Sequence, residues 1–146
     1  MSSYNVYQAF HDRLTGSWTQ TLLCFENENI EAPYDANGAP LPFVYVEIYG
    51  DDLYQETVGA PGDNQWLEQG VTYIHVMVPS FTGTAAARQS ADEIANLFRE
   101  SPLATDAGNI HIPEMSIGGG EPGKDFPNFW ALTITMHWHV RTITGS

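Results

Sequence analysis

Three histidines are the side chains whose spacing comes nearest to that of a metal site. His137 and His139 are two positions apart in a segment of alternating polarity, so on a β-strand both project from the same face. His75 lies in a separate apolar segment, and three imidazoles gathered on one sheet would be able to bind a transition metal. No carboxylate or further histidine stands at tight spacing to complete a coordination shell. We therefore favour polar residues on a less buried strand face, and we expect no metal.

Nucleophilic side chains are present without the surroundings that activate them. Cys24 is the only cysteine, which excludes an intrachain disulfide, and it has no activating motif, so we expect a small, partly buried side chain. Ser80, Ser90 and Ser116 lack the Gly-x-Ser-x-Gly context of a hydrolase. The glycine run at 118–120 lacks the Gly-Lys-Ser/Thr ending of a phosphate loop. No residue argues for catalysis, and we expect neither an enzyme nor a cofactor site.

The charge of the chain is strongly negative and unevenly distributed. The 146 residues carry 18 Asp and Glu against 5 Lys and Arg, for a formal charge of −13. A net negative surface repels phosphate, which excludes a protein that binds DNA or an anionic membrane through a basic face. No Lys or Arg occurs between Arg13 and Arg88, an interval that contains Glu26, Glu28, Glu31, Asp35, Glu47, Asp51, Asp52, Glu56, Asp63 and Glu68.

Three interpretations of this acidic interval are open. The acids are either solvated residues of loops and strand edges, which keep the protein soluble, or a surface that faces another polyanion without adhering to it. The third interpretation is a metal site formed by Asp51, Asp52 and Glu56. That site would need the regular ligand spacing of a calcium loop, which is absent here.

Apolar periodicity predicts the elements that must position these residues. It indicates helices at about 4–15 and 84–99 and strands at about 42–50, 53–58, 65–79, 109–117 and 126–141. Residues 17–41 read as a long loop with at most a short extended piece at 22–25, and 118–125 as a flexible glycine-rich tip. We predict one α+β domain over residues 1–146: a mainly antiparallel sheet of four to five strands, with two helices packed on one face.

The chain has more aromatic side chains than one sheet and two helices can easily bury in a core. Tyr and Trp are favoured at protein–protein interfaces, so part of this surplus is expected at a contact between subunits. A larger core is the alternative. The candidate interface residues are Tyr45, Tyr49, Tyr54, Trp66 and Phe129.

Several strings along nearly the whole chain resemble one family. They are the amphipathic start Val6–Leu14 with Trp18, the Asn27–Glu31 loop leading into Pro42–Val46, the strand Gly70–Pro79, then Gly83, Ala86 and Ala91–Phe98, and finally Trp130–Trp138. In this pattern the chain is similar to the tail terminator, or tail completion, proteins of long-tailed bacteriophages and gene transfer agents. None of the strings is a diagnostic motif, and the match is one of overall pattern.

The resemblance implies a structural protein of the virion, made in the host cytoplasm and placed at the neck-proximal end of the tail. Such proteins form a homo-hexameric ring that caps the tail tube, stops its polymerisation and contacts the head connector protein. DNA passes through the ring without specific binding. Six copies would carry roughly −78, and we expect a lumen lined by the acids of 47–68, namely Glu47, Asp51, Asp52, Glu56, Asp63 and Glu68.

Two other functions remain open from the sequence. The first is another neck or tail-tube protein, and the second is a small acidic ligand-binding module or enzyme with an unrecognised site. A membrane protein is not expected, because no stretch approaches the ~18 apolar residues of a membrane span and the first 14 residues do not form a signal peptide.

Overall fold

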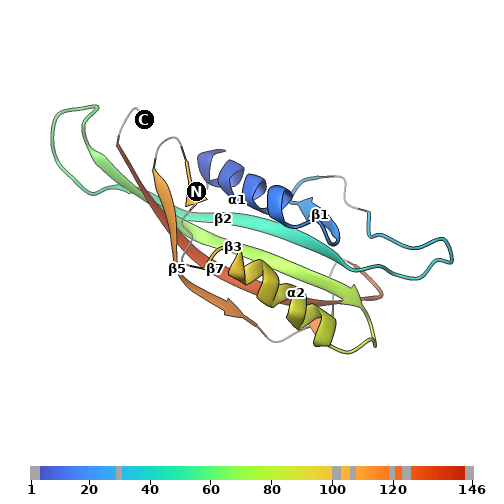
Figure 1. Cartoon of the computed structure of the whole chain (residues 1–146). Helices are drawn as coiled ribbons and strands as arrows, with labels where there is room; N and C mark the ends of the chain where they lie inside the picture. The colour runs from blue at the N-terminus through green and yellow to red at the C-terminus, as the bar shows by residue number, and fades with distance from the viewer. Residues whose placement is uncertain are drawn as a thin grey trace.

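Two helices pack on one twisted sheet in the computed structural model, which describes residues 4–28, 31–99, 103–105, 108–118, 121–122 and 126–143 (Figure 1). The helices are α1 (Tyr4–Ser17) and α2 (Ala85–Asn96). The strands are β1 (Leu22–Phe25), β2 (Phe43–Gln55), β3 (Gln65–Pro79), β4 (Leu103–Ala104), β5 (Asn109–Ile117), β6 (Glu121–Pro122) and β7 (Phe129–Ile143).

The sheet is mixed, not purely antiparallel. Its strand order is β1-β2-β3-β7-β5-β4, and the short β6 also pairs with β7. Strand β1 runs parallel to β2, and every other pairing is antiparallel. The predicted number of strands, four to five, was therefore too low, and the sheet is not purely antiparallel. Strand β4 has only two residues, too few for a period-two pattern to identify, and the short extended piece expected at 22–25 joins the sheet as β1.

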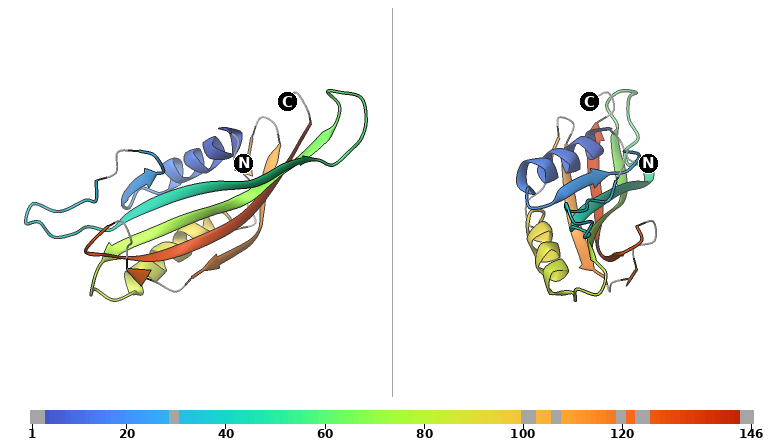
Figure 2. Two further views of the ribbon diagram at one scale, coloured as in Figure 1. Left: turned by 180° about the vertical axis from the view of Figure 1, so that it is seen from behind. Right: turned by 90° about the vertical axis from the view of Figure 1, so that its right-hand side faces the viewer.

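The main core lies between the helices and one face of the sheet. Helix α1 buries Val6, Phe10 and Leu14, which recur at helical spacing, and α2 buries a stripe that includes Ala87 and Ala91. These side chains pack in one cluster with alternate residues of β2, β3 and β7. Figure 2 shows both helices on the same side of the sheet, which confirms the predicted placement.

Strand β2 is continuous where the sequence predicted two strands. The predicted break at Asp51 is a β-bulge: Gly50 pairs with Gly70, and Asp52 pairs with Gln69. The extra residue reverses the alternation of side chains along the strand. Residues 47 and 49 lie on one face before the bulge, and residues 52 and 54 lie on that same face after it.

The long segment between α1 and β2 covers one end of the other sheet face. Leu22–Phe25 is the extended piece expected there, and it forms β1. A second small core contains Cys24, Phe43, Met77, Phe129 and Ala131, with Ala32, Tyr45 and Phe126 packed against it. Over the rest of this face the described residues form no helix (Figure 2). Of the predicted glycine-rich tip, residues 119–120 and 123–125 lie outside the described residues.

Candidate functional site

The face of the sheet opposite the helices, here called the open face, presents polar and aromatic side chains. In-register partners share a face, so the pairings define its members. They are Tyr45, Glu47, Tyr49, Asp52 and Tyr54 of β2; Gln69, Tyr73 and His75 of β3; His111, Glu114 and Ser116 of β5; and Thr133, Thr135, His137, His139 and Arg141 of β7.

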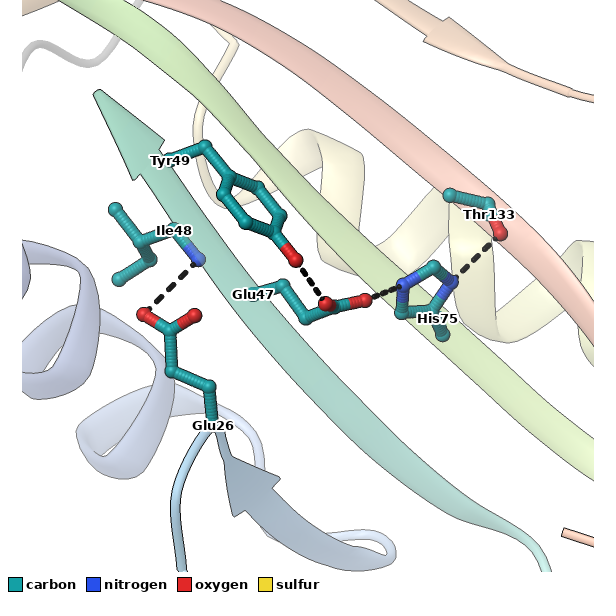
Figure 3. A network of polar contacts seen from close by, with 6 residues as sticks. All are labelled: Glu26, Glu47, Ile48, Tyr49, His75 and Thr133. Atoms are coloured by element: carbon teal, nitrogen blue, oxygen red, sulfur yellow. Dashed lines mark hydrogen bonds and ion pairs between the residues drawn. The ribbon is translucent and has the colours of Figure 1, made fainter. Parts of the chain in front are cut away.

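A polar network crosses three strands at the centre of the open face (Figure 3). The His75 ring lies 2.8 Å from the Thr133 hydroxyl through Nδ1 and 2.6 Å from a Glu47 carboxylate oxygen through Nε2. The Tyr45 and Tyr73 rings stack beside the imidazole, at centroid distances of 5.8 and 6.3 Å. The imidazole is therefore fixed by two hydrogen bonds and two aromatic neighbours.

The other oxygen of Glu47 accepts a hydrogen bond from the Tyr49 hydroxyl (Figure 3). This bond, followed by burial and the negative charge of the carboxylate, raises the pKa of Tyr49 to about 12. One carboxylate thus links a histidine of β3 to a tyrosine of β2. Neighbouring strands are thus tied together by side-chain hydrogen bonds.

A second carboxylate occupies the exposed edge of β2. Strand β1 pairs with β2 only as far as Val46, and the Glu26 carboxylate then accepts from the Ile48 amide at 3.4 Å (Figure 3). Burial raises the pKa of Glu26. The hydrogen bond from Ile48 partly opposes this shift, and the negative charge of Glu47 adds to it. Sequence reasoning did not single out Glu26, because its role depends on where β1 stops pairing.

The three histidines of the hypothetical metal site do not converge. His75 is paired with Thr133, whereas His137 and His139 lie further along β7. His139 instead lies beside His111, with ring centroids 5.5 Å apart, and burial, Arg141 and His111 lower the pKa of His139. Among the described residues no group of three or more His, Cys, Asp or Glu has a geometry that could hold a metal ion.

Cys24 is buried in the second core. Its burial, followed by the nearby charge of Glu28, raises the pKa of the thiol. A raised pKa disfavours the thiolate, which is the nucleophilic form. This position agrees with the expected packing role.

The predicted acidic residues differ in their surroundings. Asp51, Asp52 and Asp63 are exposed on the β2–β3 hairpin, and Glu56 forms an ion pair with Arg141 at 3.0 Å. The amide of Gln65 and then Arg141 hold the pKa of Glu56 below its usual value.

The prediction that Glu68 belongs to the acidic lining of a lumen was wrong. It is only 4% exposed and pairs across the strands with Leu53 and Val140, on the face that the helices cover. The bulge in β2 does not alter the alternation of β3, so Glu68 points to the inside of the chain. Glu68 is therefore not among the residues that we assign to an acidic surface.

The predicted interface aromatics also divide. Tyr49 and Tyr54 are 46% and 44% exposed, and Tyr45 and Trp66 are half-buried. Phe129 is 2% exposed and lies edge-on to Phe43, so its assignment to an interface was wrong. Phe129 belongs to the second core, whose buried members come from β1, β2, β3 and β7.

Comparison with known proteins decides the family. The family model described as phage tail terminator protein matches residues 5–138. The chain belongs to the phage tail terminator family. This terminator protein is thus a structural component of the phage tail, as the sequence resemblance predicted.

The fold of the terminator chain is found in a solved structure. One solved structure, of a protein without a functional name, is similar with a TM-score of 0.69 and 19% identity, over 96% of each chain. At that identity the likeness concerns the fold alone. No curated protein matches the sequence. No helix in the described part of the terminator is long and apolar enough to cross a membrane.

Proposed function

We propose that six copies of this protein form a ring on the head-proximal end of the tail tube. The ring ends tube polymerisation, presents a surface to the head connector protein and lets DNA pass through its centre. The observation that carries the proposal is the match of the family model over residues 5–138.

The charge distribution supports a passage for DNA. The β2–β3 hairpin extends beyond the helices (Figure 1), and it carries exposed acids and no base. We assign Glu47, Asp51, Asp52, Glu56 and Asp63 to the side that faces the lumen. Phosphate groups are repelled by such a surface, so DNA is not retained as it passes.

The subunit contacts are proposed to use the remaining exposed aromatics. Tyr45, Tyr49 and Tyr54 lie on the open face of β2, whereas Trp66 of β3 lies on the opposite face of the sheet. Large aromatic side chains with a polar end suit a surface that is exposed to water before assembly and buried afterwards.

Tail length in particles that lack this protein tests the proposal. A terminator limits polymerisation, so its loss is expected to give overlong tubes, measured by electron microscopy of negatively stained lysates. The wild-type gene supplied in trans should restore the normal length. Headless tails of normal length would instead indicate a joining role, and normal particles would refute both.

A further inference from the structure

Strand β5 is attached to the sheet mainly along one side. It pairs with β7, whereas on its outer side the described part of β4 pairs only with Asn109 and Ile110 (Figure 1). A bulge between His111 and Glu114 also interrupts the pairing with β7. An edge strand with so few neighbours is able to separate from a sheet while the rest of the fold stays closed.

Two histidines face each other where β5 meets β7. His111 and His139 are in-register partners, and their ring centroids lie 5.5 Å apart at an interplanar angle of 31°. His111 is exposed and His139 is half-buried, and neither ring is hydrogen-bonded to a described residue. Like charges placed directly opposite one another destabilise a sheet, so the pair weakens the junction when both rings are protonated.

The groups around His139 do not compensate a proton on its ring. Strand β3 contributes the neutral Gln69, which pairs with His139. The titratable and charged groups among the described neighbours are His137 and Arg141 of β7, His111 and Glu114 of β5, and Asp51, Asp52 and Glu56 of the hairpin. Of the acids, Glu56 is paired with Arg141 at 3.0 Å. Asp52 accepts a hydrogen bond from Gln69 at 3.3 Å, and Asp51 is exposed, where water screens its charge. Glu114 lies opposite His137.

Protonation of His139 therefore disfavours the folded chain. Burial, then Arg141 and His111, lower the pKa of His139 below its ordinary value of 6.5, while Glu56 acts in the opposite direction. The unfolded chain thus binds this proton more tightly than the folded chain does. The stability that the neutral ring supplies is complete above pH 6.5 and is lost as the pH falls through the lowered pKa of the folded chain.

We infer that the contact between His111 and His139 makes the attachment of β5 to β7 sensitive to acid. Neutral rings pack side by side, whereas in acid the two imidazolium rings and Arg141 place three positive charges on one face of these strands. Their repulsion separates β5 first, because the outer side of this strand has little pairing to oppose it. Separation exposes the hydrogen-bonding edge of β7. The inference concerns the chain itself and goes beyond the proposed ring.

Hydrogen exchange of the full-length protein at pH 7.5 and pH 5.0 tests this inference. After correction for intrinsic exchange rates, the protection of the amides at 114–117 relative to those of β3 should fall at least about threefold in acid. His139→Gln should abolish this fall. His137→Gln changes the same residue type on the same strand, opposite Glu114, and is the matched control that should keep the fall. Unchanged protection of the wild type in acid, or a fall that persists in His139→Gln, would overturn the inference.

Urea unfolding at the same two pH values gives a second, independent measurement. His111→Gln, His139→Gln and the double variant form a cycle with the wild type, and its coupling term is the interaction between the two rings. This coupling should oppose folding at pH 5.0 by a factor of about three or more in the unfolding equilibrium constant, and should not oppose it at pH 7.5. Equal coupling at both pH values refutes the inference. Because the purified chain is measured, that result leaves the ring proposal, which tail length tests, unaffected.

Discussion

Glu47 shows how one side chain can join several strands of a sheet. Its two carboxylate oxygens are hydrogen-bonded to His75 and Tyr49, and His75 is also hydrogen-bonded to Thr133 on β7. The group is half-buried, so its hydrogen bonds are only partly in competition with water. Polar residues on the open face thus hold their own geometry before any partner binds.

Tyr49 is predicted to ionise far above the usual pH of a tyrosine. Its pKa of about 12 exceeds the ordinary 10, so the stabilisation that it supplies is complete below pH 10 and is lost as the pH rises through 12. The difference in absorbance at 295 nm between wild type and Tyr49→Phe isolates this residue during titration. Glu47→Gln should move the transition down toward 10, and an unchanged transition would contradict the assigned cause.

Two glycines are predicted to respond in opposite ways to alanine. A Cβ at Gly70 would lie 2.2 Å from the Tyr49 carbonyl oxygen and 2.6 Å from the Trp138 ring, whereas a Cβ at Gly16 meets nothing within 4 Å. Gly70→Ala should destabilise by about 1–3 kcal/mol or more. Gly16→Ala, within α1, should stabilise by about 0.5–1 kcal/mol. Urea unfolding measures both, and equal effects would contradict the packing.

The β2–β3 hairpin is the element that extends furthest from the core. Its tip, between Gln55 and Gln65, is exposed except for Asn64, which is 7% exposed. The Asn64 amide donates to the carbonyls of Gly59 and Ala60 at 3.3 and 3.1 Å. A single buried side chain therefore shapes a tip that has few other contacts with the body of the chain.

Asn64→Ala is predicted to loosen the tip without unfolding the domain. Loss of these hydrogen bonds should cost about 1 kcal/mol locally, because the core under the helices is not involved. Hydrogen exchange of the amides at 57–63 should become faster, while the exchange of β3 and β7 stays as in wild type. A cooperative loss of protection over the whole sheet would show that the tip is not an independent unit.

On the scale of the whole molecule, the acidic hairpin and an exposed aromatic turn lie at the two ends of β3. Exposed acids lie on the hairpin, and the exposed Phe81 turn lies where β3 leads into α2, at the opposite end of β3. A subunit with distinct ends suits a ring that meets the tail tube on one side and the head connector on the other.

Reversal of the hairpin charge is predicted to slow DNA ejection. Asp51→Lys with Asp63→Lys adds four positive charges to each copy and should retain phosphate in the lumen, while tails keep their normal length. Asp12→Lys with Glu31→Lys makes the same change in charge at exposed positions away from the hairpin and is the control. Equal ejection rates for the two pairs would place the hairpin outside the DNA path.

Periodicity in the sequence determined the long elements. The alternation of Gln65–Pro79, and of most of β7, predicts strands with one or two apolar faces, and the spacing of Phe10 and Leu14 predicts α1. These patterns are local, so they can be recognised in the sequence without knowledge of the rest of the fold. The resemblance of several strings to the tail terminator family likewise predicted a structural protein of the phage tail.

Only the tertiary structure decided how these elements share their surfaces. The parallel pairing of β1, the bulge in β2, the burial of Glu68 and Phe129 and the exposure of Phe81 depend on partners distant in the chain. The burial of a residue depends on which other parts of the chain pack over it, and the residue type does not specify those neighbours. For the same reason composition revealed an acidic chain, while the fold decided which acids face water.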